Sequence, residues 1–86
     1  MNKKYNFIMS KEYKLDTENI NSQVKFLASR QGYTLGKLKE KINLVYGKKD
    51  KVSNFGNKMK LGRLRISDMA EIAEILGYEI ILREIK

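Results

Sequence analysis

Apolar residues recur along this chain at spacings of three and four, the period of amphipathic helices. The pattern predicts four helices, over residues 17–31, from Thr34 to about Gly47, over 51–60 and over 67–76. The side chains expected to face the core are Ile20, Val24, Leu27 and Ala28 in the first helix, Leu35, Leu38, Ile42 and Val45 in the second, Val52, Phe55 and Met59 in the third, and Met69, Ile72, Ala73 and Leu76 in the fourth.

Small polar residues and glycines predict the helix ends, because a polar side chain can accept from the first free N–H groups and glycine tolerates the left-handed residue that closes a helix. Tyr46 to Asp50 is expected to form the turn before the third helix. The expected N-caps are Asp16 or Thr17, Thr34, Asp50 and Ser67, and the expected stops are Gly32, Gly47, Gly62 and Gly77.

The two ends of the chain have a different pattern. Residues 78–85 are rich in β-formers without a breaker and predict a strand. In the N-terminal arm, Tyr5, Phe7 and Met9 alternate as in a strand, whereas Tyr5, Ile8 and Met9 also fit a helical turn. A lone strand needs a partner, which either the arm or the same strand of a second subunit must supply, and we slightly favour a sheet-mediated homodimer.

The expected fold is therefore mainly α, with four to five helices and a short C-terminal strand. Residues 1–15 form an arm and residues 16–86 the domain. A chain of 86 residues with 42% hydrophobic residues is enough for one compact domain. It contains no Pro, Cys or His, which excludes disulfides, thiolate chemistry, Cys/His zinc sites and histidine catalysis. No apolar run is long enough to span a bilayer, and the start lacks a signal-peptide core, so we expect a cytoplasmic protein without membrane contact.

Charge is distributed unevenly. Residues 30–65 carry eleven Lys/Arg and two acids, whereas residues 66–86 carry two Lys/Arg and five acids, within a net charge of +8. The positive excess is thus concentrated in the middle of the chain. Such a concentration predicts a polyanionic partner, with nucleic acid as the leading candidate.

Three segments in this order resemble the lambda-repressor-like, Cro/C1-type helix-turn-helix family. They are Thr34-Leu35-Gly36-Lys37-Leu38-Lys39-Glu40-Lys41-Ile42, Val52-Ser53-Asn54-Phe55-Gly56-Asn57-Lys58-Met59, and Met69 to Tyr78. The stretch "EIAEILGYEI", residues 71–80, is similar to the helix that closes such domains. The resemblance covers roughly residues 19–82. Three features depart from it: Lys39 replaces a usual small residue, Asn43 stands near a usual glycine, and the turn before the third helix is lengthened over residues 44–50. A longer turn changes the direction in which the third helix points.

The resemblance implies that the helix over 51–60 recognises double-stranded DNA, while the start of the preceding helix lies against the phosphate backbone. Asn pairs bidentately with adenine, Lys prefers guanine, and Ser donates or accepts, which agrees with that role. The backbone amides near Gly36 and Lys37 would add a dipole for one phosphate. The expected base-reading residues are Ser53, Asn54, Asn57 and Lys58, and the expected phosphate-binding residues are Thr34, Lys37, Lys48, Lys49, Lys51, Lys60, Arg63 and Arg65.

These features predict a sequence-specific DNA-binding transcriptional regulator, a repressor of phage or mobile-element type, with no cofactor or metal. An enzyme is disfavoured, because Glu71, Glu74 and Glu79 lie beside an apolar stripe without metal-ligand spacing or a glycine-rich cradle. The alternative is a small phage-encoded inhibitor of the anti-CRISPR type that uses this scaffold to block a nucleic-acid enzyme. Its protein target would then contact the acidic segment from Asp68 to Glu84.

Overall fold

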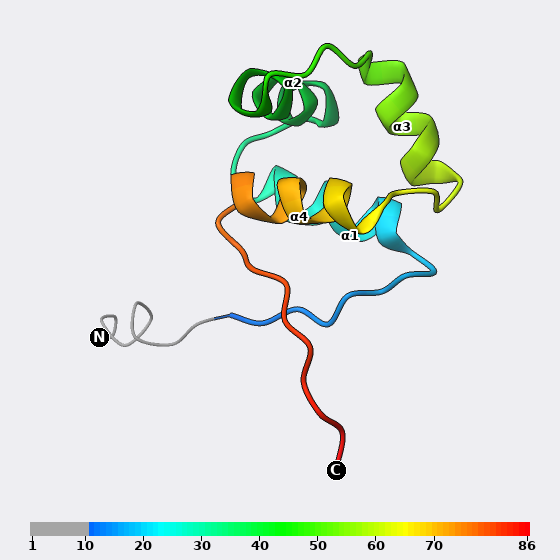
Figure 1. Ribbon diagram of the computed structural model, residues 1–86, viewed down its shortest axis with the longest axis vertical. Helices are drawn as coiled ribbons and strands as arrows, with labels where there is room; N and C mark the ends of the chain where they lie inside the picture. The colour runs from blue at the N-terminus through cyan, green and yellow to red at the C-terminus, as the bar shows by residue number, and fades with distance from the viewer. Residues whose placement is uncertain (1–10) are drawn as a thin grey trace.

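A computed structural model describes residues 11–86 and contains four helices in that range, joined by short turns (Figure 1). The expected arm residues Tyr5, Phe7, Ile8 and Met9 lie outside the described part. The mainly α class is confirmed. The helices are α1, Ile20–Ser29; α2, Leu35–Tyr46; α3, Val52–Lys60; and α4, Ile66–Ile75.

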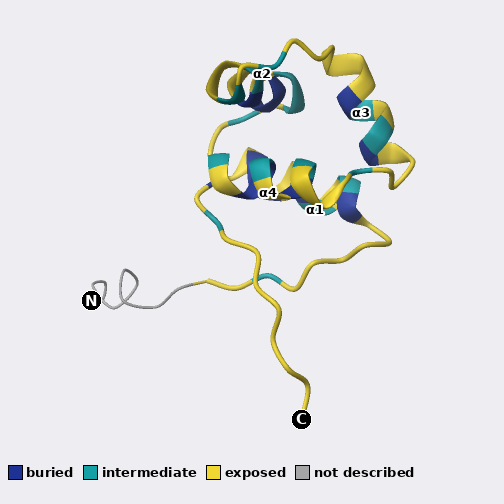
Figure 2. Cartoon of the chain, viewed as in Figure 1, coloured by how far each residue is buried: buried dark blue, intermediate teal, exposed yellow. Residues whose placement is uncertain are grey.

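Helix α2 is the centre of the packing, because it contacts each of the other three, and α1 also contacts α3. All four helices contribute buried residues to one hydrophobic cluster (Figure 2). Leu38, Ile42, Met59, Ile72 and Val24 are the largest of those that are almost fully buried. Burying side chains of this size stabilises the fold by roughly 1.5–3 kcal/mol each.

The predicted core is correct at most positions and wrong at two. Val45 is 51% exposed and Val52 is 38% exposed. In α2, the buried positions follow a spacing of four from Leu38 to Ile42, and the next position in that row is Tyr46, which packs against the core in place of Val45. Val52 is the first residue of α3, with its Cγ1 near Gly36 of α2.

The glycine stops were predicted correctly, whereas three of the four expected N-caps are wrong. Gly32, Gly47, Gly62 and Gly77 all have positive φ. Thr34 caps α2, its Oγ1 accepting from the Lys37 N–H at 3.2 Å. Neither Asp16 nor Thr17 caps α1, which begins after Asn19; the Asp16 carboxylate instead accepts from the Glu18 and Asn19 N–H groups in the preceding turn.

At α4 the cap is an acid inside the helix. The helix begins at Ile66, so Ser67 lies within its first turn. The Asp68 carboxylate accepts from the Arg65 backbone N–H at 3.0 Å, and its negative charge also suits the positive end of the helix dipole. The hydroxyl of Ser67 is therefore not needed as a cap.

The turn between α2 and α3 has the expected length of five residues, displaced by one position, and does not extend over the whole of residues 44–50. Residues 44–46 complete the last turn of α2, and Gly47, at φ 65°, closes the helix, which leaves residues 47–51 as the connection. A side chain at residue 47 would be strained in this left-handed conformation. The helix, turn and helix from Leu35 to Lys60 thus form a compact unit.

The predicted C-terminal strand is not present in residues 11–86. Residues 78–86 are extended without a strand ladder, because no described segment pairs with their backbone. The segment does lie beside the described end of the arm: the ring of Tyr13 is 5.9 Å from that of Tyr78, and Arg83 pairs with Glu12 at 3.0 Å. Both segments lie on the side of the helical body away from the α2–α3 turn (Figure 1).

Candidate nucleic-acid interface

The outward face of α3 is polar and open. Phe55 and Met59 fix the inward direction of this helix, with 5% and 1% of their surfaces exposed. At about 100° per residue, Asn57 lies roughly opposite that direction, with Ser53 and Lys60 to one side and Asn54 to the other. All four are exposed, whereas Lys58 is half-buried. Three of the four expected base-reading residues are therefore accessible along their helix, and the fourth is on its flank.

Cations flank α3 at both ends. Lys49 and Lys51 precede the helix, and Lys60, Arg63 and Arg65 end or follow it; all five are exposed. None of them forms an ion pair within residues 11–86. A nine-residue helix is about 14 Å long, close to the major-groove width of about 12 Å. The two cationic ends are thus separated by a distance that suits phosphates on opposite sides of that groove.

A hollow runs along one side of α3. Asn54, Asn57 and Lys58 form its helical wall, and Arg63 and Asp68 close it from the α4 side. The structure thus brings three expected base-reading residues, Asn54, Asn57 and Lys58, together with one expected phosphate ligand, Arg63. Lys39 and Asp50 also line the hollow, although the sequence did not identify them as site residues.

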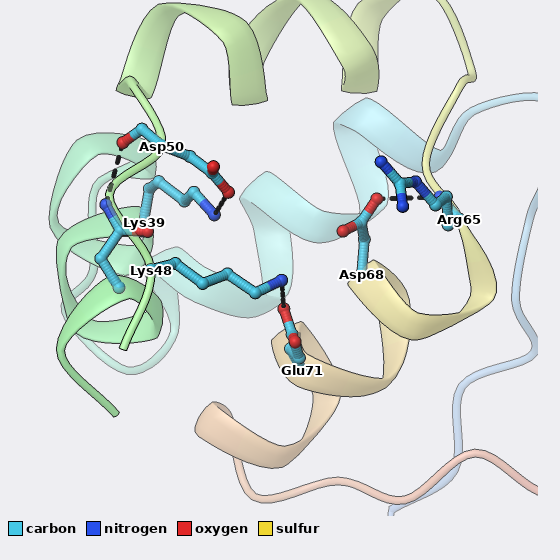
Figure 3. Close-up of polar contacts among 7 residues, drawn as sticks. Lys39, Lys48, Asp50, Arg65, Asp68 and Glu71 are labelled. Carbon is cyan, nitrogen blue, oxygen red and sulfur yellow. Dashed lines mark hydrogen bonds and ion pairs between the residues drawn. The ribbon is translucent and has the colours of Figure 1, made fainter. Parts of the chain in front are cut away.

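Asp50 fixes the turn that leads into α3. Its carboxylate accepts from Lys39 Nζ at 2.9 Å, and its backbone carbonyl accepts from Asn43 Nδ2 at 2.9 Å (Figure 3). Lys39 and Asn43 are two of the positions at which the sequence differs from the pattern of the family that it resembles. Both side chains bond to Asp50. Asp50 therefore ties the turn to α2 in place of capping α3, the N-cap that was expected of it.

The ammonium group of Lys39 is well compensated despite its burial. Its side chain is 5% exposed, the Asp50 carboxylate neutralises its charge, and the Phe55 ring lies 5.3 Å from Nζ. The hydrogen bond from Lys39 holds the pKa of Asp50 below its usual value of 3.8. Because Phe55 belongs to α3, Lys39 joins α2, the turn and α3 at one point.

A second set of contacts joins the end of α2 to α4. Lys48 Nζ lies 2.7 Å from Glu71 Oε1 (Figure 3), and the Tyr46 hydroxyl donates to the Glu74 carboxylate. The bond to Glu71 raises the pKa of Lys48, and the bond to Glu74 raises the pKa of Tyr46 to about 12. Lys48, an expected phosphate ligand, is thus engaged within the protein and is less available than its neighbours.

At the start of α2, Thr34 and Lys37 are exposed, as an interface with phosphate requires. The Lys37 backbone N–H, which was expected to face a phosphate, is used by the Thr34 cap. The Thr34 hydroxyl can still donate its own proton to an outside acceptor. The side chains of these residues, more than the helix dipole, are therefore the groups available to a phosphate here.

Comparison of the chain with protein-family models, curated proteins and solved structures gave no match. Among residues 11–86, no helix combines the length and the apolar character needed to cross a bilayer.

Proposed function

We propose that the protein is a sequence-specific double-stranded DNA-binding regulator of transcription, a repressor of phage or mobile-element type acting in the cytoplasm. Helix α3 reads bases through Asn54, Asn57 and Ser53, with Lys58 at its flank. Phosphates are bound by the exposed cations at its two ends and by Thr34 and Lys37. The observation that carries this proposal is the open amide-bearing face of α3 between two groups of exposed cations, which form no ion pair with any other described residue.

The chemistry of this face supports base recognition in addition to general attraction to DNA. Exposed lysines bind phosphates of any sequence, whereas an asparagine amide offers a donor and an acceptor that match the adenine edge in the major groove. Asn54 and Asn57 are three residues apart and therefore neighbours on the helix surface. Two adjacent amides of this kind favour sites that contain adenine.

The competing proposal, an inhibitor that contacts a protein through the acidic segment, finds less support. Glu71 and Glu74 are bonded to Lys48 and Tyr46, and Asp68 caps α4. These acids hold the fold together. Of the acids in that segment, Glu79 and Glu84 are left without a hydrogen bond inside residues 11–86.

Selection of bound duplexes from a random DNA pool, followed by footprinting, tests the regulator proposal. We expect an enriched motif with adenine at positions covered by the protein. If two copies bind together, the motif should be roughly palindromic with half-sites about 10 base pairs apart. A pool without enrichment after repeated rounds, despite binding at low salt, would contradict sequence-specific recognition and favour the inhibitor.

A further inference from the structure

Leu61, the residue at which α3 ends, extends the row of amides on the outer face of that helix. It follows Asn57 by four residues and Asn54 by seven. At about 100° per residue, it therefore lies within roughly 40° of both around the helix axis. All three residues line the same hollow beside α3. The outer row of α3, which we define as Asn54, Asn57 and Leu61, thus contains two amides followed by one apolar side chain.

The exposure of Leu61 is not a requirement of the way in which α3 ends. Helices α3 and α4 both end in a leucine followed by a glycine with positive φ. In both, the N–H of the residue after that glycine donates to a helix carbonyl at 2.8 Å, which satisfies the end of the helix. Leu76 at the end of α4 is 2% exposed and belongs to the core, whereas Leu61 is 62% exposed. The same rigid ending therefore fills the core in one helix and presents a leucine beside the amides in the other.

An adenine–thymine pair offers a group that matches this leucine. In the major groove, the adenine edge carries the donor and acceptor that an asparagine amide can pair with, and the thymine of the same pair presents its C5-methyl group. An amide bound to adenine therefore lies close to a methyl group. Asn57 and Leu61 are neighbours on the helix surface, with Cβ atoms about 5–6 Å apart. A leucine beside such an amide can remove the methyl group from water.

The surroundings of Leu61 favour DNA over a protein as its partner. Lys60 and Arg63, on either side of it in the chain, are exposed and form no ion pair within residues 11–86. Protein-docking surfaces consist of contiguous apolar patches of a few hundred square ångströms. A leucine between two cations suits a small apolar group that is flanked by phosphates, and a thymine methyl group in a duplex is such a group.

We propose that Leu61 recognises thymine through an apolar contact with its 5-methyl group, at or next to the base pair that Asn57 binds. This inference rests on the proposed function and adds a third kind of base contact to it. The two amides select adenine, and Leu61 makes one thymine distinguishable from every base that lacks the methyl group. The phosphate-binding cations supply affinity but not this discrimination.

Replacement of thymine by uracil in the selected duplex tests the proposal, because uracil keeps the base pairing and removes only the methyl group. Each thymine of the selected motif is replaced in turn, and the affinity of the unaltered protein is measured by fluorescence anisotropy. We expect one replacement, at or beside the pair that depends on Asn57, to weaken binding by about fourfold, the effect of losing one buried methyl group. Leu61→Ala should bind the thymine and uracil duplexes equally at that position, and Leu61→Met, which stays apolar, should still distinguish them.

Leu44→Ala is the matched control, since Leu44 is 78% exposed on α2, outside the candidate interface. It should keep the fourfold effect of uracil. A selected motif in which no uracil replacement matters would overturn this inference and leave the regulator proposal standing. A Leu61→Ala protein that keeps the full uracil effect, or that weakens binding to the thymine and uracil duplexes alike, would also overturn it, the latter by assigning Leu61 to the sugar–phosphate backbone. A selection without any enriched motif would overturn both proposals together.

Discussion

At the scale of single residues, Asn57 and Lys49 represent the two kinds of DNA contact. Asn57 lies opposite the buried side of α3, where its amide can meet a base edge, whereas Lys49 is an exposed cation in the turn. We expect Asn57→Ala to weaken binding to the selected site by about 1–3 kcal/mol and to relax the base preference. Lys49→Ala should weaken binding to all sequences alike and reduce the salt dependence by about one phosphate contact.

Fluorescence anisotropy on the selected duplex and on a scrambled duplex of equal length measures both effects. The decisive quantity is the ratio of the two affinities. If Asn57→Ala leaves that ratio unchanged, α3 does not read sequence through this residue.

Tyr46 provides a residue-scale test of the packing between α2 and α4. Its hydrogen bond to Glu74 raises the pKa of the phenol to about 12. Since the neutral phenol is the donor, the bond contributes to stability below pH 10 and is lost as the pH rises through about 12. Ultraviolet titration should show a late ionisation step that belongs to Tyr46. Tyr46→Phe should remove that late step and Tyr33→Phe should leave it; a titration unaffected by Tyr46→Phe would show that this bond is absent in solution.

At the scale of elements, the contact between Lys39 and Asp50 determines how the turn presents α3. We expect Lys39→Met to change the free energy of unfolding only modestly, because methionine fills similar space and the Asp50 carboxylate, with its side chain 52% exposed, stays hydrated. The ratio of affinities for selected and scrambled DNA should nevertheless fall, because the turn is no longer held to α2. Urea denaturation and anisotropy measure the two effects.

Lys41→Met is the matched control, since it makes the same substitution on the exposed face of the same helix. It should leave the affinity ratio unchanged. A Lys39→Met protein that discriminates as well as the unaltered protein would show that the turn holds its shape without this ion pair.

Substitutions at two glycines should change the stability of the protein in opposite directions. Gly56 lies inside α3, and a Cβ there would meet Leu35 Cδ2 at 4.0 Å, an ordinary contact. Gly56→Ala should therefore stabilise the protein by roughly 0.5–1 kcal/mol through helix propensity. Gly47→Ala should destabilise it by about 1 kcal/mol, because φ is 65° at that position. Thermal denaturation of both variants checks the signs; shifts in the same direction would contradict this backbone geometry.

The sequence predicted those elements whose causes are local. Helical periodicity identified all four helices, and glycine chemistry identified where each one ends. It failed at the start of α3: the helix begins one residue later than expected, so Lys51 and not Asp50 holds the N-cap position, and a buried lysine eleven residues before Asp50 binds its carboxylate. The strand at residues 78–85 failed for a related reason, because β propensity cannot supply the second strand that a ladder needs.

The same division holds for the candidate site: its local features could be predicted from the sequence, and its tertiary contacts could not. Exposure of Asn54 and Asn57 follows from the spacing of Phe55 and Met59 on the same helix. The engagement of Lys48 by Glu71, and the place of Lys39 and Asp50 beside the hollow, follow from tertiary packing that no local pattern encodes. Only one feature of the sequence pointed to the Asp50 contacts: Lys39 and Asn43 differ from the pattern of the family that the sequence resembles. Two unusual residues on one face of a helix suggest a shared partner.

At the scale of the whole molecule, acidic and basic side chains have different roles: the acids of α4 bond within the protein, whereas many of the cations face solvent. The acids of α4 bond to Tyr46 at the end of α2, to Lys48 in the following turn, or to the start of their own helix. Six cations are exposed and form no ion pair within residues 11–86: Lys37, Lys49, Lys51, Lys60, Arg63 and Arg65. The exposed cations are therefore available to an outside anion.

The most direct test of the central claim, that this cationic surface lies along duplex DNA, is the salt dependence of affinity for the selected duplex. Six exposed cations that each neutralise a phosphate would give a slope of log K against log salt near −5 per protomer, measured between about 50 and 200 mM salt. A slope of about −3 to −5, with tighter binding to the selected duplex than to the scrambled one, is the expected result. No binding to double-stranded DNA even at the lowest salt would contradict the claim.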